Sequence, residues 1–221
     1  MFAGYHGAYE YDVVWYSDDG GATYTTAKNA SGNGEVAKIW LQDEVALAEG
    51  EGGEVFLSMR NEAYHKGYPQ DPNITCNCRG LSRSLDGGST FGPSVPAPVL
   101  VGPVCEATML SLPKASGDGH IVFHANPGHG TDKESKSPPN GRATGTVRRS
   151  EDGGRTWVAS VDLNGDQAYS YSCLTRVPQP GYIGVAFETV LPGSDVKSGA
   201  SANNIVFTLV PQNFSNHRNR E

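Results

Sequence analysis

The stretch Ser150-Glu151-Asp152-Gly153-Gly154-Arg155-Thr156-Trp157 occurs three times in the chain with small changes. The other copies are residues 17–24 and 84–91, and all three share the pattern Ser-x-Asp-x-Gly-x-Thr-aromatic. Their first residues, Ser17, Ser84 and Ser150, are 67 and 66 residues apart. A pattern that returns at a nearly constant long period indicates an internal repeat, in which each copy marks one structural unit.

The residue types in this pattern suit a tight turn between two strands. An Asp side chain can hydrogen-bond to its own backbone two residues on, and Gly adopts the positive φ that such turns need. The Thr and the aromatic residue then lead back into a half-buried strand. We therefore interpret the three copies as structural turns that carry no catalytic chemistry.

Composition favours one turn-rich all-β domain. The chain has 221 residues, with 28 Gly and 14 Pro, which is enough for one sizeable core. Its formal net charge is −7 and it has no run of Lys or Arg, so nucleic acids and anionic membrane surfaces are not expected partners. No stretch approaches the roughly 18 apolar residues of a membrane span.

Short apolar runs predict many strands, and they recur at long period with the repeated turns. Strands are expected at 13–16, 55–59, 121–123, 169–177, 182–187 and 205–210. Residues 36–47 fit a helix face or strands, and their Gly-rich flanks favour strands. Radial repetition of this kind predicts a β-propeller, and at about 40–50 residues per blade the chain holds about four blades. We expect the propeller domain to cover residues 1–211 and a polar tail to cover 212–221.

The cysteines and sequons say little about compartment. Cys76 and Cys78 are too close in sequence for an easy internal bridge, and no second pair or His cluster completes a zinc set, so no metal is expected. Three glycosylation sequons, at Asn29, Asn73 and Asn213, are weak support for secretion. Met1 leads directly into what reads as strand and turn, so we expect no signal peptide in this chain.

Two hairpins place polar residues together at their open ends. One turns at residues 50–53, and counting back from its centre puts Glu44 opposite Arg60; the other turns at 178–181 and puts Tyr171 opposite Glu188. Arg142 lies eight residues before the third repeat, so a strand of roughly 26 Å separates it from that turn. These residues are therefore expected on the face opposite the repeats.

Longer segments around these residues resemble the sialidase family. The three repeats look like that family's Asp boxes, and residues 57–61, Leu-Ser-Met-Arg-Asn, look like its strand ending in Asn-x-Arg-Asn. Residues 142–150 resemble the segment with the last arginine of a triad, and 171–175, Tyr-Ser-Cys-Leu-Thr, the segment with the nucleophilic tyrosine. Residues 182–188 resemble the following strand, which ends in an acid, and 76–79 look most like the lysosomal sialidases of animals. The resemblance runs from about residue 4 to 210.

The resemblance implies a six-bladed propeller, of which about four blades are present, and retaining exo-α-sialidase activity. Implied substrates are terminal sialic acids of glycoproteins, oligosaccharides and gangliosides, with no cofactor, in a lysosomal or secretory compartment. The implied roles are Tyr171 as nucleophile, Glu44 as its base, Glu188 as orienter of a further arginine, and Arg60, Arg142 and Asn61 as substrate-binding residues.

These residue types fit the substrate. Arginines bind a carboxylate through paired, charge-assisted hydrogen bonds that Lys cannot copy. The substrate's carboxylate would repel a carboxylate nucleophile, whereas a neutral phenol is not repelled and can pass its proton to a nearby Glu. Tyr169 lies on the same strand face as Tyr171 and could be confused with it. Tyr171 is preferred because Ser-Cys-Leu-Thr follows it. Arg79, Arg148 and Arg149 are expected to be structural or solvated.

The chain departs from the family pattern at its beginning. It has no arginine before Arg60, and none of its early aspartates, Asp12, Asp18, Asp19 and Asp43, matches the acid/base loop of the family. We therefore expect half of the site to lie outside this chain, as in a fragment or a truncated gene product. The alternative is a propeller that binds sialoglycans without catalysis.

Overall fold

The structure is a computed structural model, and it describes residues 1–6, 11–29, 42–61, 76–128, 142–190, 202 and 204–215. Every regular element in these ranges is a β-strand, as the composition predicts. None of the described elements is a helix with the length and apolarity needed to cross a bilayer. Part of the ambiguous segment 36–47, namely 36–41, lies outside the described residues, and so does the sequon residue Asn73.

Most strands form four antiparallel sheets that follow one another along the chain. The first two sheets contain β1 (Phe2–His6), β2 (Tyr11–Tyr16) and β3 (Thr25–Thr26), then β5 (Gln42–Glu49), β6 (Val55–Asn61), β7 (Cys78–Ser84) and β9 (Val95–Val101). The next two contain β10 (Thr108–Pro113), β11 (His120–Pro127), β12 (Gly145–Ser150) and β13 (Ala159–Asp162), then β14 (Tyr169–Arg176), β15 (Tyr182–Thr189) and β16 (Asn204–Pro211). A short parallel pair, β4 (Lys28–Asn29) and β8 (Thr90–Phe91), links the first two sheets.

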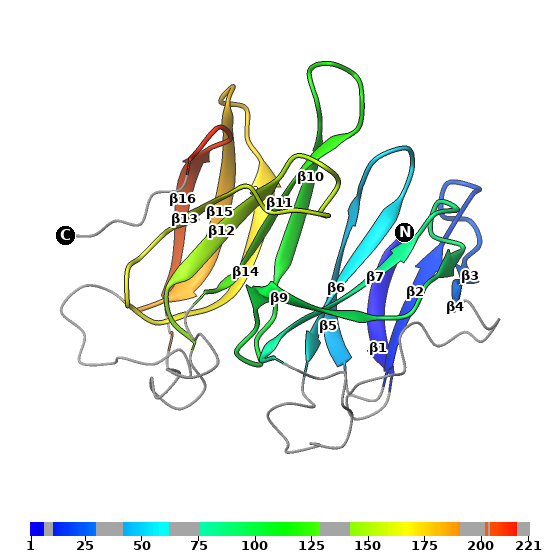
Figure 1. The fold of residues 1–221 in the computed structure, drawn as a ribbon, viewed down its shortest axis with the longest axis horizontal. Coiled ribbons are helices and arrows are strands. Elements are labelled where there is room, and N and C mark those ends of the chain that lie inside the picture. The colour runs from blue at the N-terminus through cyan, green and yellow to red at the C-terminus, as the bar shows by residue number, and fades with distance from the viewer. Residues whose placement is uncertain are drawn as a thin grey trace.

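The sheets stand side by side in chain order, from the blue first sheet to the orange and red fourth sheet (Figure 1). Their first strands contact one another: β1 packs on β5, β5 on β10, and β10 on β14. Small antiparallel sheets repeated around their innermost strands are the arrangement of a β-propeller. The described residues form four such units, as the chain length predicts.

The three repeated stretches form the same turn with the same hydrogen bonds. In the second repeat, the Ser84 hydroxyl donates to Asp86 Oδ1 at 2.7 Å and accepts from the Gly88 amide at 2.7 Å. The amide and hydroxyl of Thr90 both donate to the Asp86 carboxylate, at 2.8 and 2.7 Å. Residues 17–24 and 150–157 repeat this network. The Asp thus binds groups four residues on, two residues further than expected, and so closes a larger loop.

Glycine is required in these turns for conformation and for space. Gly154 has a φ of 80°, and a Cβ added there would lie 2.5 Å from the ring of Phe56 on β6. Any side chain would therefore be strained and would also clash with the neighbouring sheet. The repeat turns consequently fix how one sheet packs on the next.

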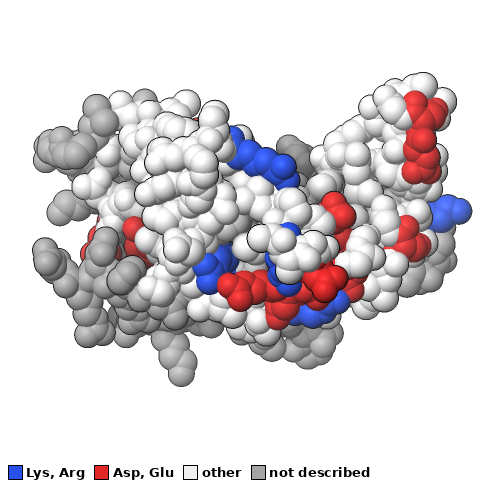
Figure 2. Space-filling model, turned by 90° about the horizontal axis from the view of Figure 1, so that it is seen from above, with Lys and Arg blue, Asp and Glu red and all other residues white. Residues whose placement is uncertain are grey.

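The repeat turns and the hairpin turns gather at one end of the sheets. Glu51, in the β5–β6 turn, accepts a hydrogen bond from Lys114 Nζ at 2.9 Å and lies 3.6 Å from Arg155 Nη1 of the third repeat. Figure 2 views the molecule from above and shows acidic and basic side chains interleaved on this end. The charges compensate one another in the middle of Figure 2, whereas a separate group of acidic side chains at its upper right is not interleaved with basic ones.

One expectation about the cysteines is wrong. Cys76 and Cys78 are joined in a disulfide, although only Asn77 separates them. Their Cα atoms are 5.3 Å apart, which is within the ordinary range for a disulfide, because the chain bends at this point before entering β7.

Candidate functional site

The candidate site lies where three innermost strands begin, at the end opposite the repeat turns. Glu44 is near the start of β5, Glu106 lies two residues before β10, and Tyr171 is near the start of β14. β10 packs against both β5 and β14, so these three residues come from neighbouring sheets. They lie at the same end of the three innermost strands. Arg60, at the end of β6, and Arg142, ahead of β12, complete the group.

A chain of contacts joins Tyr171, Glu44 and Arg60. The Tyr171 hydroxyl donates a hydrogen bond to Glu44 Oε1, and Arg60 Nη1 donates to Glu44 Oε2 at 2.6 Å. Burial, the hydrogen bond to Glu44 and the negative charge of Glu44 together raise the pKa of Tyr171, so its phenol is neutral at neutral pH. Tyr171 is 38% exposed and therefore open to a ligand. The phenol thus faces a carboxylate that Arg60 holds in place.

The register of the β5–β6 hairpin differs from the expectation by one residue. Asp43, not Glu44, lies opposite Arg60, and the ladder shifts between Asp43 and Ala46. Glu44 occupies this bulge with a φ of 43°, a left-handed conformation that is unfavourable for a non-glycine residue. Arg60 Nε also lies 3.6 Å from Asp43 Oδ1. The bulge lets both acids reach one arginine, which a regular ladder would not allow.

Arg142 reaches the same place from the third sheet. Its Cζ lies 5.7 Å from the centre of the Tyr171 ring, and its Nη2 donates to the Val104 carbonyl at 2.7 Å. Glu44 has a positive φ, and Val104, whose carbonyl binds Arg142, has a φ of 49°, so two of the three non-glycine residues with positive φ in the described ranges contact this site. Backbone strain of this kind persists only where the surroundings impose it, and it gathers at functional sites.

The remaining predicted residues lie nearby. Glu188 Oε2 accepts the amide of Tyr171 at 3.3 Å, so the predicted neighbours do meet, although the β14–β15 ladder shifts between Tyr169 and Ser172. Asn61 ends β6 with a side chain that is 2% exposed. The roles given above to all six residues stay predictions.

The structure separates the two tyrosines that the sequence could confuse. Tyr169 is fully buried and its ring stacks on Phe187 with centroids 5.0 Å apart. Its side chain belongs to the core of the third and fourth sheets. Only Tyr171 therefore presents its hydroxyl to the site.

Arg79 is a buried structural residue next to the site. It is fully buried and donates to Ser58 Oγ at 3.0 Å, to the Ser58 carbonyl at 2.8 Å and to the Cys105 carbonyl at 2.7 Å. Burial lowers its pKa to about 10, which leaves the guanidinium charged at neutral pH. The arginine thus ties the second sheet to the segment before β10.

Glu106 belongs to the site and was not anticipated from the sequence. Its Oε2 accepts the amide of Ser172 at 3.1 Å, directly after Tyr171. Burial raises its pKa from 4.5 to about 7. The only sequence signal is an acid placed just before an apolar strand, and that pattern is too common to single out this residue.

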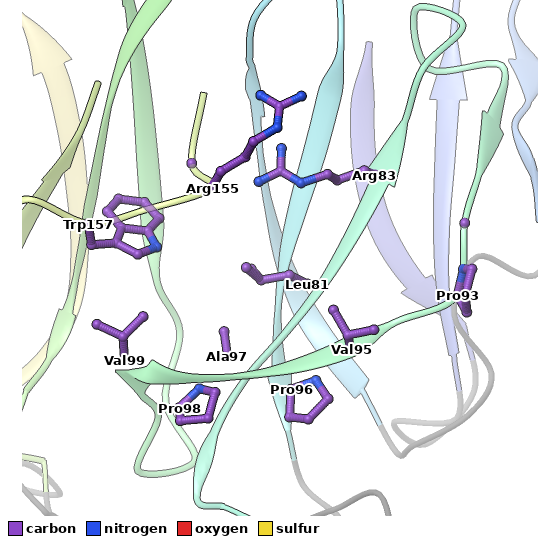
Figure 3. Close-up of a pocket in the computed structure, with 12 residues that line it drawn as sticks. Leu81, Arg83, Pro93, Val95, Pro96, Ala97, Pro98, Val99, Arg155 and Trp157 are labelled. Carbon is purple, nitrogen blue, oxygen red and sulfur yellow. The ribbon is translucent and has the colours of Figure 1, made fainter. Parts of the chain in front are cut away.

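No group of His, Cys, Asp or Glu in the described ranges is arranged to hold a metal ion. A cavity of about 560 Å³ lies elsewhere, between β7, β9 and the third repeat. Figure 3 shows Trp157 and Arg155 on one side of it and Pro96 and Pro98 on the other. This cavity is separate from Tyr171 and contains no carboxylate in its lining.

Comparisons with known proteins agree with this geometry. No protein-family model matches the chain. Over 190 residues, or 84% of the chain, it is 30% identical to a sialidase of Micromonospora viridifaciens, of which it spans 24%.

Two solved structures share the fold. A Hadza microbial sialidase matches with a TM-score of 0.59 and 22% identity, covering 91% of this chain and 32% of that one. The intramolecular trans-sialidase from Ruminococcus gnavus matches with a TM-score of 0.59 and 20% identity, covering 88% of this chain and 35% of that one. The chain is therefore a homologue of the sialidases, and its sheets are those of part of a sialidase-type β-propeller.

Proposed function

We propose that the polypeptide to which these residues belong is a retaining exo-α-sialidase with Tyr171 as its nucleophile. The observation that best supports this is the contact chain from the Tyr171 hydroxyl through the Glu44 carboxylate to Arg60. A phenol is a weak nucleophile while it holds its proton, and an adjacent carboxylate can remove that proton during attack. Arg60 orients the carboxylate for this transfer.

The chemistry can be written with these groups. Tyr171 Oη forms a bond to the anomeric carbon as its proton passes to Glu44, and the bond from that carbon to the leaving oxygen breaks. Water then attacks the same carbon and gives a proton to the group that protonated the leaving oxygen. The bond from that carbon to Tyr171 Oη breaks as Glu44 returns the proton to Tyr171, and the sugar is released with its original configuration. The leaving oxygen needs a proton from an acid, which we expect in a part of the polypeptide outside this chain.

Two arginines are proposed to bind the carboxylate of the substrate. Sialic acid carries a carboxylate on its anomeric carbon, and Arg60 and Arg142 bring two guanidinium groups to the surroundings of Tyr171. Asn61 is proposed to assist them, and Glu188 to orient a third arginine. The proposed substrates are terminal sialic acids on glycoproteins, oligosaccharides and gangliosides, in a lysosomal or secretory compartment.

A sialoglycan-binding propeller without catalysis is the second candidate. It is favoured by the lack of any arginine before Arg60 and by the positions of the early aspartates. Asp12 and Asp43 are fully buried, and Asp18 and Asp19 sit in the first repeat turn, at the far end from Tyr171. None of the four is placed as an acid for a leaving group.

The two proposed functions differ in whether the polypeptide cleaves a bound sialoside. The polypeptide restored with its upstream coding sequence should be incubated with a fluorogenic α-sialoside while ¹H NMR follows the released sugar. Release of the α anomer first would support a retaining sialidase. Saturable binding without release would favour the second candidate, and neither binding nor release would contradict both.

A further inference from the structure

Glu106 and Glu188 hold two consecutive amides of the strand that carries Tyr171. Glu188 Oε2 accepts the Tyr171 amide at 3.3 Å, and Glu106 Oε2 accepts the Ser172 amide at 3.1 Å. Tyr171 lies within the shift of the β14–β15 ladder, and Ser172 pairs with Phe187 where the regular ladder resumes. The two carboxyl groups therefore fix the backbone from which the Tyr171 side chain reaches Glu44.

The surroundings of Glu106 oppose its ionisation. Burial dominates, and the negative charges of Glu44 from β5 and Glu188 from β15 add to it. The Ser172 amide and the positive charge of Arg79 from β7 act in the other direction. The nearby Cys105 thiol and Tyr169 phenol both have pKa values raised by burial, so they are neutral at neutral pH. The result is a pKa of about 7 for Glu106, so this carboxyl changes its charge near neutral pH.

We propose that Glu106 is a positioning residue that also limits binding of the anionic substrate at high pH, because its ionisation adds a further carboxylate to the site. This inference rests on the proposed function for its substrate. A carboxylate at the base of the site, beside Glu44 and Glu188, repels the carboxylate that Arg60 and Arg142 attract. While Glu106 is protonated, it still accepts the Ser172 amide and adds no charge.

The expected consequence is a rise of KM with pH. In the unsubstituted polypeptide, KM for an α-sialoside should increase on the order of tenfold as pH rises through about 7, with kcat changing much less. Glu106→Gln stays neutral and keeps an oxygen that can accept the Ser172 amide. This variant should match the parent within about twofold near pH 5.5 and bind about tenfold more tightly near pH 8.5.

A matched control is Glu151→Gln. Glu151 is an exposed carboxylate in the third repeat that pairs with Arg149 Nη2 at 2.8 Å, far from Tyr171. Its replacement removes the same charge without touching the site, so the KM profile should not change. An equal shift in both variants would show a general charge effect and would overturn the proposal.

A second measurement does not depend on turnover. In polypeptide labelled with [¹⁵N]serine, the Ser172 amide is assigned by the peak lost in Ser172→Ala and followed between about pH 5 and 9. Its proton shift should titrate with a midpoint near 7 in the parent and stay flat in Glu106→Gln. A flat profile in the parent would overturn the inference whatever the activity. The Ser172 amide could instead titrate with a midpoint near 7 while the polypeptide binds no sialoside at any pH. That result would contradict the proposed function, and with it the substrate part of the inference.

Discussion

The hydroxyl of Tyr171 donates a hydrogen bond to the carboxylate of Glu44, 127 residues away in the sequence. One residue comes from the second sheet and the other from the fourth, and the third sheet lies between them in the chain. The contact exists because the innermost strands of all three sheets begin at the same end. Its first consequence concerns the acidity of the phenol.

Replacing Glu44 with Gln should lower the pKa of Tyr171. Glu44 opposes ionisation of the phenol through its charge and by accepting the phenolic proton, and Gln removes the charge. 3-Fluorotyrosine can be incorporated, and ¹⁹F NMR can follow the resonance that is lost in Tyr171→Phe. An unchanged or higher pKa in Glu44→Gln would show that the two side chains do not interact in solution.

Replacing Arg79 with Met should destabilise the fold by about 2–4 kcal/mol, because buried carbonyls of Ser58 and Cys105 would lose their donor. Urea unfolding measures the loss. Arg176→Met is the matched control, since Arg176 is exposed and makes one long hydrogen bond, to the Ser111 carbonyl at 3.4 Å. The control should stay within about 0.5 kcal/mol of the parent. Equal effects of the two variants would contradict the structural role of Arg79.

The repeat turns should weaken in acid. The Thr90 amide and hydroxyl lower the pKa of Asp86 to about 2, below its ordinary value of 3.8. A carboxyl with a lowered pKa stabilises the fold above the unfolded value, and that contribution is lost as pH falls through the folded value. The stability difference between the parent and Asp86→Asn should therefore shrink between about pH 4 and 2. A difference that stays constant over this range would contradict the observed hydrogen bonds.

Local sequence patterns were sufficient to predict the architecture. The spacing of the repeats predicted several similar sheets, and the apolar runs at 55–59, 121–123 and 205–210 lie within β6, β11 and β16. Counting from the second hairpin turn correctly brought Tyr171 to Glu188. These features succeed because a turn and the alternation of a strand depend on neighbouring residues.

Features that depend on strand pairing or on residues far away in the sequence could not be predicted. The bulge at Glu44 moved Asp43 opposite Arg60, and residues 42–44 are all polar, so they show no alternation from which an inserted residue could be recognised. β9 contains Pro96 and Pro98, which argue against a strand, yet it forms because it lies at the edge of its sheet, where missing amide donors are tolerated. Glu106 becomes distinctive only through Ser172, Glu44 and Arg79, which lie far away in the sequence.

Residues 1–221 alone should be poorly stable and inactive. Two sheet edges of a partial propeller stay open, which lowers stability. Without an acid for the leaving oxygen, turnover should fall by at least the roughly 10²–10⁴-fold that positioned proton transfer contributes. The assay compares this chain with the polypeptide restored with its upstream sequence. Similar rates for the two would show that the chain already contains a complete site.

The central claim is that the Tyr171 hydroxyl is the attacking group, and Tyr171→Phe removes only that oxygen. In the restored polypeptide, this variant should lose turnover of a fluorogenic α-sialoside by at least about 10³-fold while sialoside binding and the unfolding midpoint change little. Tyr182→Phe, at the turn end of the same hairpin, is the control and should keep full activity. Turnover by Tyr171→Phe within about tenfold of the parent would contradict the claim.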